Sequence, residues 1–249
     1  MAVTELVLIA TFLVVIGALA IVHRQLRRDD QIFVLRSITA YDALRQQVGM
    51  AVESGRRPLL TLGRGSLHTP AGPTSMAALQ VLQDLGQAAG NGSLTPYVTV
   101  GAATLLPIAQ DRLRTAADRS AQPDDFHATD VQFIADESFP FAYAAGTAEI
   151  IGRNETGDSI AIGRFGTELA IIGEAAARSE NQQIMGSDDT SAIAIATAFT
   201  QNSLWGEEIF AAGAYLRRTA LQMASVRVQD LMRWAVAIAM ILAAILQLL

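Results

Sequence analysis

The sequence contains neither cysteine nor lysine among its 249 residues. Without cysteine the chain has no disulfide, no thiolate metal ligand and no cysteine nucleophile. Without lysine it has no Schiff-base amine, no Ser–Lys dyad and no P-loop lysine. The net charge of −6 disfavours nucleic acid as a partner, because phosphate binding needs a basic face. These absences remove several classes of enzyme and most nucleic-acid-binding domains.

Charge is scarce at the N-terminal end, where residues 6–22 form an uncharged apolar run that is followed by four basic or histidine residues. A membrane-spanning helix needs about 20 apolar residues, and a positive flank stays in the cytoplasm. We therefore predict an N-terminal transmembrane anchor over residues 1–28. A cleaved signal peptide is the alternative: Ala18-Leu19-Ala20 resembles a cleavage site, but Glu5 stands where a positive residue is expected.

The C-terminal end repeats this pattern, because residues 234–249 are apolar except for Gln247 and follow Arg227 and Arg233. We predict a C-terminal transmembrane helix here; a buried helix or a helix on the membrane surface are the alternatives. Both arginine-rich flanks then lie on one side of the lipid bilayer. The expected location is the cell membrane, with the main domain on its cytoplasmic side.

Two helical connectors are expected between these ends and the main domain. Residues 29–56 are predicted to form an amphipathic helix, because apolar residues recur at three- and four-residue steps from Ile32 to Val52 and Gly55 suits a helix C-cap. This stripe either packs on the domain or pairs with another copy. Residues 204–233 are predicted to form the second connecting helix.

Five strand–loop–helix units fill residues 57–203, and the strands are short and largely apolar, as in a sheet covered on both faces. Alternating strands and helices imply a parallel sheet with right-handed crossovers. The sequence predicts an α/β fold, a doubly wound, Rossmann-like, mostly parallel five-stranded sheet between two transmembrane helices. The predicted strands are Leu59–Leu62, Tyr97–Val100, Val131–Ile134, Ser159–Ile162 and Gln183–Met185.

Ligands of parallel sheets gather at the carboxyl ends of the strands. The segment 63–66 can offer backbone N–H groups and a guanidinium to a phosphate or carboxylate, although it matches neither the dinucleotide nor the P-loop fingerprint. The simpler interpretation is a set of tight turns. The candidate ligand-binding residues are Gly63, Arg64, Gly65, Ser66, His68, Asp136, Arg164 and Asp188. If a site exists, we expect the loop at 63–69 to face Asp136 and Asp188.

A hard metal ion is a second interpretation of these loops. Asp136, Glu137, Asp188 and Asp189 could supply oxygen ligands. Paired acids before a helix are more often caps that favour the helix dipole. We therefore assign no metal and no cofactor.

Hydrolysis is a third interpretation. Ser66 or Ser138 could form a triad with His68 or His127 and an aspartate. The chain lacks the G-x-S-x-G elbow that would place such a serine. We therefore assign no catalytic residue.

The run 51–63, Ala-Val-Glu-Ser-Gly-Arg-Arg-Pro-Leu-Leu-Thr-Leu-Gly, resembles one found in an uncharacterised family of prokaryotic membrane proteins. The resemblance covers mainly residues 40–200. It implies an α/β domain flanked by transmembrane helices, and it carries no activity.

Two functions follow as expectations. The first is a membrane-anchored, non-enzymatic scaffold that forms a homo-oligomer through its cytoplasmic α/β domain, suggested by the apolar stripe and by helices rich in small residues. The alternative is a membrane-tethered sensor or binding domain for a small anionic ligand or nucleotide at the carboxyl ends of the strands.

Overall fold

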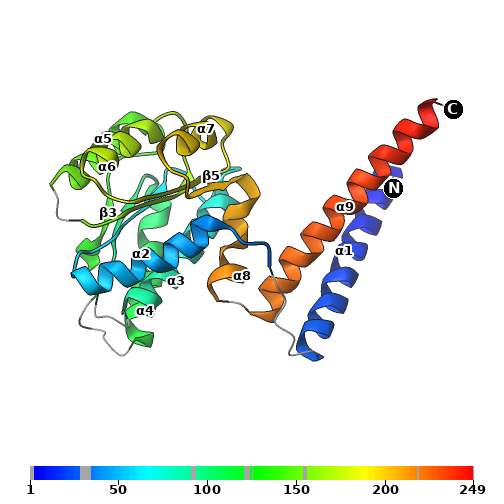
Figure 1. The fold of residues 1–249 in the computed structure, drawn as a ribbon, viewed down its shortest axis with the longest axis horizontal. Helices are drawn as coiled ribbons and strands as arrows, with labels where there is room; N and C mark the ends of the chain where they lie inside the picture. The colour runs from blue at the N-terminus through cyan, green and yellow to red at the C-terminus, as the bar shows by residue number, and fades with distance from the viewer. Residues whose placement is uncertain are drawn as a thin grey trace. The chain divides into compact units, whose positions relative to one another are not determined.

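The structure is a computed structural model, and it describes residues 3–28, 35–90, 94–120, 124, 126–153, 156–217 and 219–248. The chain divides into two compact units (Figure 1). Residues 1–36 and 217–249 form the first unit, and residues 37–216 form the second. Part of the predicted connector, residues 29–34, lies outside the described residues.

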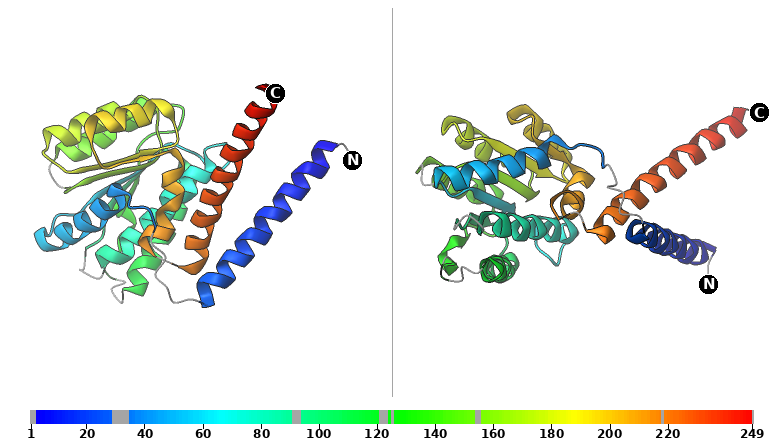
Figure 2. Two further views of the ribbon diagram at one scale, coloured as in Figure 1. Left: turned by 45° about the vertical axis from the view of Figure 1, so that its right-hand side comes forward. Right: turned by 60° about the horizontal axis from the view of Figure 1, so that its bottom comes forward.

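The first unit consists of two long helices, α1 (Val3–Arg28) and α9 (Ala220–Leu248). They pack side by side and run in opposite directions (Figure 2). Among the described residues, none of the helices has the combined length and apolarity required for a membrane crossing. The two predicted transmembrane helices are therefore not supported, and their uncharged runs in the sequence are shorter than the roughly 20 residues that a span requires.

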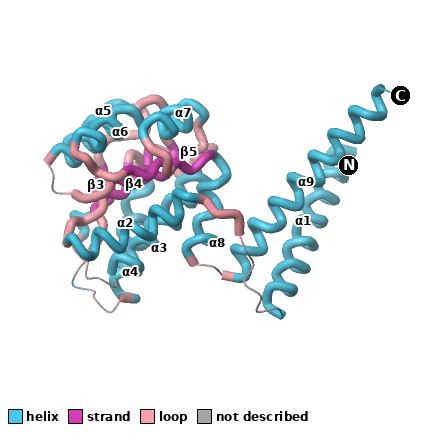
Figure 3. The backbone as a smooth tube through the Cα atoms, viewed as in Figure 1, coloured by secondary structure: helices cyan, strands magenta, loops and turns pink. Residues whose placement is uncertain are grey.

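The second unit alternates strands and helices, as the sequence predicts (Figure 3). Its elements in order are α2 (Thr39–Ser54), β1 (Leu59–Gly63), α3 (Gly72–Gly90), β2 (Tyr97–Val100), η1 (Ala103–Leu105), α4 (Leu106–Arg119), η3 (Ala128–Asp130), β3 (Val131–Phe133), α5 (Pro140–Gly152), β4 (Ser159–Arg164), α6 (Leu169–Arg178), β5 (Gln183–Ser187), α7 (Thr190–Phe199), β6 (Ser203–Trp205), η4 (Gly206–Ala211) and α8 (Ala212–Leu216).

The sheet is parallel throughout, with the order β3-β2-β1-β4-β5-β6. This is the strand order of the doubly wound Rossmann fold, in which the chain reverses direction across the sheet between the first and fourth strands. The α/β class and the parallel sheet are thus confirmed. The prediction of five strands is wrong, because β6 pairs with β5 through Met185↔Ser203 and Ser187↔Trp205.

Helices cover both faces of the sheet, which explains its apolar strands (Figure 1). One face is packed by α5, α6 and α7, where Tyr143 and Ile172 contact a cluster that includes Leu59 and Ala161, all fully buried. Because side chains alternate along a strand, Leu60 and Ile160 point to the opposite face. They are also fully buried, and α3 packs along β1 and β4 on that side.

The region predicted as one connecting helix, residues 204–233, is instead divided among β6, η4, α8 and the start of α9. Gly206 adopts a left-handed φ of 52° directly after β6 and turns the chain. The Glu208 carboxylate then accepts the backbone N–H of Trp205 at 3.1 Å. A continuous helix cannot pass through such a turn.

Candidate functional site

The carboxyl ends of β1 and β4 approach so closely that glycine is required in both strands. Gly63 has φ 73°, and a Cβ there would lie 2.5 Å from the carbonyl oxygen of Arg164. Gly163 has φ 154°, and its Cβ would overlap the carbonyl oxygen of Leu62. The backbone N–H of Arg64 donates to the carbonyl of Arg164 at 3.0 Å. The two arginines are therefore brought together at the point where the strand order reverses.

Arg64 is held by the buried carboxylate of Glu168, a residue that no sequence motif indicates. The Arg64 Nε donates to Glu168 Oε1 at 2.7 Å, and the Glu168 side chain is only 2% exposed. The same oxygen accepts the backbone N–H of Gly166 at 2.8 Å. Within the described part of the chain, both Nη groups of Arg64 lack a protein partner. The guanidinium is thus fixed along one edge and available along the other.

Arg164 is more fully neutralised than Arg64. Its Nη1 donates to Asp188 Oδ2 at 3.0 Å, and its Nη2 lies 3.4 Å from Asp189 Oδ2. The hydroxyl of Thr74, at the start of α3, donates to the same Asp188 oxygen at 2.8 Å. The other Asp188 oxygen is buried and has no hydrogen-bond partner among the described residues. The pairing joins the end of β4 to the loop after β5.

The loop after β1 is folded back on the first turn of α3. Ser75 donates through its hydroxyl to the Gly65 carbonyl at 2.7 Å, and a Cβ on Gly65 would lie 2.6 Å from that hydroxyl. The Ser66 hydroxyl is 3.3 Å from that of Thr104, and the Thr69 hydroxyl donates to the Ser66 carbonyl at 2.8 Å. This loop is therefore held by its own side chains, in a conformation that brings the backbone near β4.

A cleft of about 340 Å³ lies over these strand ends. Two arginines, several small residues and the loop between β3 and α5 form its walls. The lining residues are Arg64, Gly65, Thr69, Pro70, Ala71, Glu137, Ser138 and Arg164. We call it the switch-point cleft, because it occupies the crevice where ligands of open α/β sheets bind.

The structure brings together some of the predicted site residues and leaves others apart. Arg64, Gly65 and Arg164 line the switch-point cleft, and Gly63 and Asp188 support the two arginines from behind. Ser66 is buried beside Thr104. His68 is exposed and is not among the lining residues.

Asp136 does not line the switch-point cleft. Where the loop at 63–69 was expected to face Asp136, the lining residues are Glu137 and Ser138. The Asp136 carboxylate accepts the backbone N–H of Ser138 at 3.1 Å. This hydrogen bond lowers the pKa of the Asp136 carboxyl. Asp136 therefore stabilises the turn before α5, because a residue in that turn supplies its hydrogen-bond donor.

The alternatives of a metal site and a hydrolase receive no geometric support. Across the described residues, no group of three or more metal-ligating side chains converges. Asp189 caps α7 by accepting the backbone N–H groups of Ser191 and Ala192. In the part of the chain that is described, neither Ser66 nor Ser138 is hydrogen-bonded to a histidine.

Two supporting residues escaped sequence reasoning, Glu168 and Thr74. Glu168 lies four residues after Arg164, and Thr74 lies in the first turn of α3. Both positions suit a helix start, so their sequence signal is that of a cap. Their roles come from pairings over 104 and 114 residues of sequence.

The comparisons with known proteins bear on the family and not on the activity. No curated protein matches this chain, and no solved structure matches it either. The model of one family, described as a domain of unknown function (DUF6754), matches residues 1–249. The sequence resemblance is confirmed in that respect, whereas the membrane and prokaryotic character of the family is not shown. Since the match covers the whole chain, the chain belongs to the DUF6754 family.

Proposed function

We propose that the α/β unit is a binding domain for a small anionic molecule, which occupies the switch-point cleft. The observation that carries the proposal is Arg64. It lines the cleft, its Nε is bound to buried Glu168, and its Nη groups have no partner among the described residues. A guanidinium held in this way offers parallel N–H donors that match a carboxylate or phosphate.

The Glu168 carboxylate improves this site by fixing the donor before the ligand arrives. A free arginine side chain loses about 2 kcal/mol of rotamer entropy when it is immobilised. In this fold the pairing with Glu168 has already restricted Arg64, so less entropy remains to be lost on binding. Thr69 and Ser138 also line the cleft, but the Thr69 hydroxyl already donates to the Ser66 carbonyl, so Arg64 remains the main donor.

The charges around the cleft favour a ligand with little negative charge. Glu137 lines the cleft, and Asp188 and Asp189 already neutralise Arg164. A triphosphate would place several negative charges near these acids, whereas a monoanion needs only the free edge of Arg64. The volume of about 340 Å³ is at the small end of ligand pockets, which span about 300–1,000 Å³. We therefore favour a small carboxylate or inorganic phosphate over a nucleotide.

Thermal unfolding in the presence of candidate ligands tests this function. The probes are inorganic phosphate, two- to four-carbon carboxylates, AMP and ATP, with sodium chloride at matched ionic strength as a blank. A true ligand at one hundred times its Kd stabilises the fold by about 2.7 kcal/mol. We expect the Tm of the wild-type chain to rise with a carboxylate or phosphate, and the rise to disappear in Arg64→Ala.

The matched control is Arg114→Ala, which removes an exposed arginine from α4. It should keep the full ligand response. An equal response in Arg64→Ala and the wild type, or no response to any probe, contradicts the proposed function.

We further infer that α1 and α9 attach the α/β unit to a membrane from the cytoplasmic side. Large apolar side chains are exposed on both helices, including Phe12 at 65% and Trp234 at 70%. Exposed apolar surface of this kind is typical of membrane or protein contacts. The arginines flanking both segments support the cytoplasmic side, because anionic lipids in the cytoplasmic leaflet attract basic residues.

A homo-oligomeric scaffold, the other function expected from the sequence, stays a prediction. The apolar stripe that suggested it is used within the α/β unit, because Tyr41, Leu44 and Val48 of α2 are buried there. An oligomer of this chain therefore needs a different surface.

A further inference from the structure

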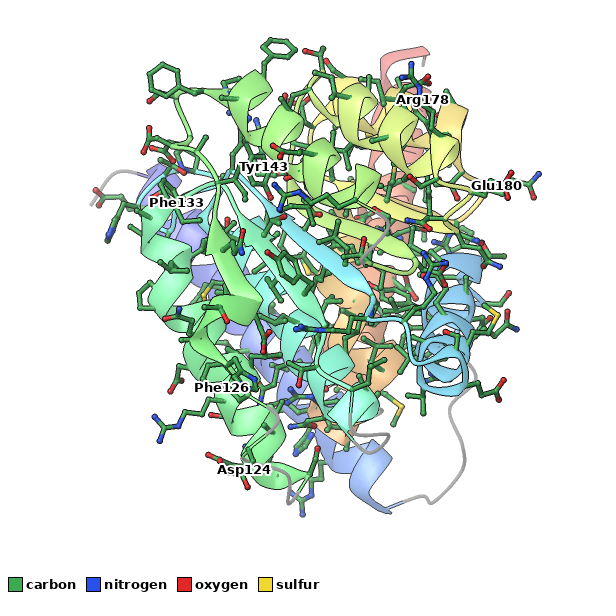
Figure 4. All side chains as sticks on the ribbon, turned by 90° about the vertical axis from the view of Figure 1, so that its left-hand side faces the viewer. Asp124, Phe126, Phe133, Tyr143, Arg178 and Glu180 are labelled. Atoms are coloured by element: carbon green, nitrogen blue, oxygen red, sulfur yellow. The ribbon has the colours of Figure 1, made fainter. Side chains whose placement is uncertain are left out.

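An apolar groove runs between α5 and α6 and has a volume of about 750 Å³. Small and aliphatic side chains form its floor, namely Ala145, Ala148 and Gly152 on α5 and Ala170, Ile171 and Ala175 on α6. A Cβ built on Gly152 meets no atom within 4 Å. We call this surface the α5/α6 groove. The groove lies on the outer side of α5 and α6. Tyr143 of α5 is instead buried on the inner side, against the sheet (Figure 4).

The exposed apolar face of α5 extends beyond the groove. Phe141 is 57% exposed and stands four residues before Ala145, so it continues the same face of the helix. Ile171 on α6 is 36% exposed. Small residues let a second helix approach closely, and the larger residues at the rim supply contact area. This combination favours a helical partner over a small molecule.

Ion pairs flank the groove in a repeated order. Glu149 pairs with Arg153 at 2.7 Å, and Glu174 pairs with Arg178 at 2.9 Å, all on exposed side chains. On each helix the acid precedes the base by four residues. Both helices follow strands of a parallel sheet, so they run in the same direction. The surface thus presents an acidic row and, one helical turn further on, a basic row.

That order of charges matches a second copy of the same surface. When two such surfaces meet antiparallel across a two-fold axis, each acidic row faces a basic row. In a parallel arrangement like charges would face each other, which is unfavourable. An isologous dimer interface requires self-complementarity of this kind.

We propose that the α5/α6 groove is a homodimer interface, in which a second copy of the chain docks antiparallel on the first. Glu149 and Glu174 then face the partner's Arg153 and the partner's Arg178. Ala148 and Gly152 lie near the two-fold axis, where the helices come closest. This inference is independent of ligand binding in the switch-point cleft.

Complementary charge variants test the interface in the full-length chain, purified in a mild detergent. An all-acidic variant carries Arg153→Glu and Arg178→Glu, and an all-basic variant carries Glu149→Arg and Glu174→Arg. By sedimentation velocity, the wild type should be dimeric, and each variant alone should have a dimer Kd raised at least about tenfold. An equimolar mixture of the two variants should restore the dimer.

The restored dimer also shows that both variants are folded, so loss of self-association cannot be attributed to unfolding. Arg114→Glu on α4, on the other face of the sheet, is the matched control and should stay dimeric. A monomeric wild type, an undiminished dimer in the all-acidic variant, or a mixture that stays monomeric overturns the proposal.

The absence of cysteine permits an independent measurement. Gly152→Cys places a single thiol near the proposed axis and should give a disulfide-linked dimer on mild oxidation. Met76→Cys, at an exposed position on α3, should not. Equal cross-linking of the two variants, or none at Gly152→Cys, also overturns the proposal, because it would place the contact elsewhere or remove it.

Discussion

At the scale of single residues, backbone geometry at the ends of β1 and β4 is the strictest requirement. Gly63 and Gly163 both have positive φ and both face backbone atoms of the neighbouring strand. Any side chain at either position must move a carbonyl group. Those carbonyls belong to the strands that present Arg64 and Arg164. Replacing either glycine would therefore disturb the cleft as well as the sheet.

Gly163→Ala should therefore lower the free energy of unfolding by at least about 2 kcal/mol. Its Cβ would overlap the Leu62 carbonyl, and its φ is unfavourable for alanine. Urea unfolding followed by circular dichroism measures the change. Gly49→Ala, in open space on α2, is the control and should not lower the free energy of unfolding, because alanine favours a helix more than glycine does. Similar losses in both variants would contradict this explanation.

Arg57 joins the amino ends of three strands, and replacing it should lower the free energy of unfolding. Its Nε donates to the Thr95 carbonyl and its Nη2 to Asp130, both at 2.6 Å, and its guanidinium lies 5.7 Å from the centre of the Tyr97 ring. Arg57→Ala leaves the Asp130 carboxylate buried without its cation. We expect the free energy of unfolding, measured with urea, to fall by about 2–4 kcal/mol.

Arg57→Lys tests the geometric part of this interaction, because lysine keeps the charge but lacks the planar guanidinium that directs separate N–H groups at Thr95 and Asp130. It should recover only part of the loss. Full recovery would mean that charge alone matters.

Asp158 should make the stability depend on pH. Burial raises the pKa of its carboxyl, and the Arg56 guanidinium only partly offsets this. Because the folded-state pKa lies above the unfolded-state value of about 3.9, the penalty for ionising Asp158 is absent at lower pH. The penalty becomes complete as the pH rises through the folded-state pKa.

Asp158→Asn should therefore raise the Tm at pH 7, and its advantage should vanish below about pH 4. The asparagine oxygen can still accept the backbone N–H of Gln182, as the carboxylate does at 3.2 Å. Scanning calorimetry from pH 3 to 8 measures both curves. A difference that grows as the pH falls would refute the assigned cause.

At the scale of elements, the edge strand β6 illustrates how packing extends the sheet. β6 contains only three residues, yet Leu204 is fully buried, and a Cβ on Gly186 would lie 2.9 Å from the Cβ of Leu204. Pairing with β6 also explains why β5 continues to Ser187, beyond the predicted end at Met185. β6 therefore stabilises the edge of the sheet through one buried side chain and a few backbone hydrogen bonds.

Leu204→Ala should lower the free energy of unfolding by about 2–4 kcal/mol, because it leaves a cavity between β6 and β5. Trp205→Ala, where the side chain is 55% exposed, should cost less than about 1 kcal/mol. Urea unfolding of both variants gives the comparison. The reverse order of the two losses would show that β6 is anchored by its tryptophan.

At the scale of the whole molecule, two units with different surfaces are joined in one chain. The α/β unit buries its apolar residues on both faces of the sheet. On α1 and α9, apolar side chains such as Leu13, Trp234 and Ile238 are exposed. This difference supports the proposal that α1 and α9 attach to a membrane and that the α/β unit binds the ligand.

Flotation of the full-length chain with phospholipid vesicles tests the attachment. The wild type should rise with the vesicles through a density gradient. A variant with Trp234→Glu and Ile238→Glu should float at least about threefold less, because charged side chains disfavour the apolar layer. Phe139→Glu, on the α/β unit, is the control and should float like the wild type. A wild type that stays with the unbound protein fraction contradicts membrane attachment.

The sequence located the elements well because local signals mark where strands begin. All five predicted strands start at the observed residues, Leu59, Tyr97, Val131, Ser159 and Gln183. Pro58 and Pro96 precede the first two, and proline disfavours a longer strand on its N-terminal side. β6 escaped notice because Ser203-Leu204-Trp205 stands outside any longer apolar run, whereas the equally short β3 belongs to the alternating run Val131-Gln132-Phe133-Ile134.

The candidate site was only partly predictable. The rule that ligands lie at the carboxyl ends of parallel strands selected Arg64 and Arg164, and both line the cleft. The same rule also selected His68 and Asp136, which do not line the cleft, because it cannot tell which side chains turn toward a crevice. Glu168 was missed because a buried carboxylate beside a helix start looks like an ordinary cap.

By itself, then, the sequence determined the alternation of short apolar strands and helices, and with it a parallel α/β sheet, since periodicity and turn residues act over a few positions. Only the tertiary structure decided the strand order that brings β1 beside β4. It also decided the pairing of Arg64 with Glu168, 104 residues away. Such contacts depend on how whole elements pack, and packing depends on shapes and burial that no local stretch of sequence contains.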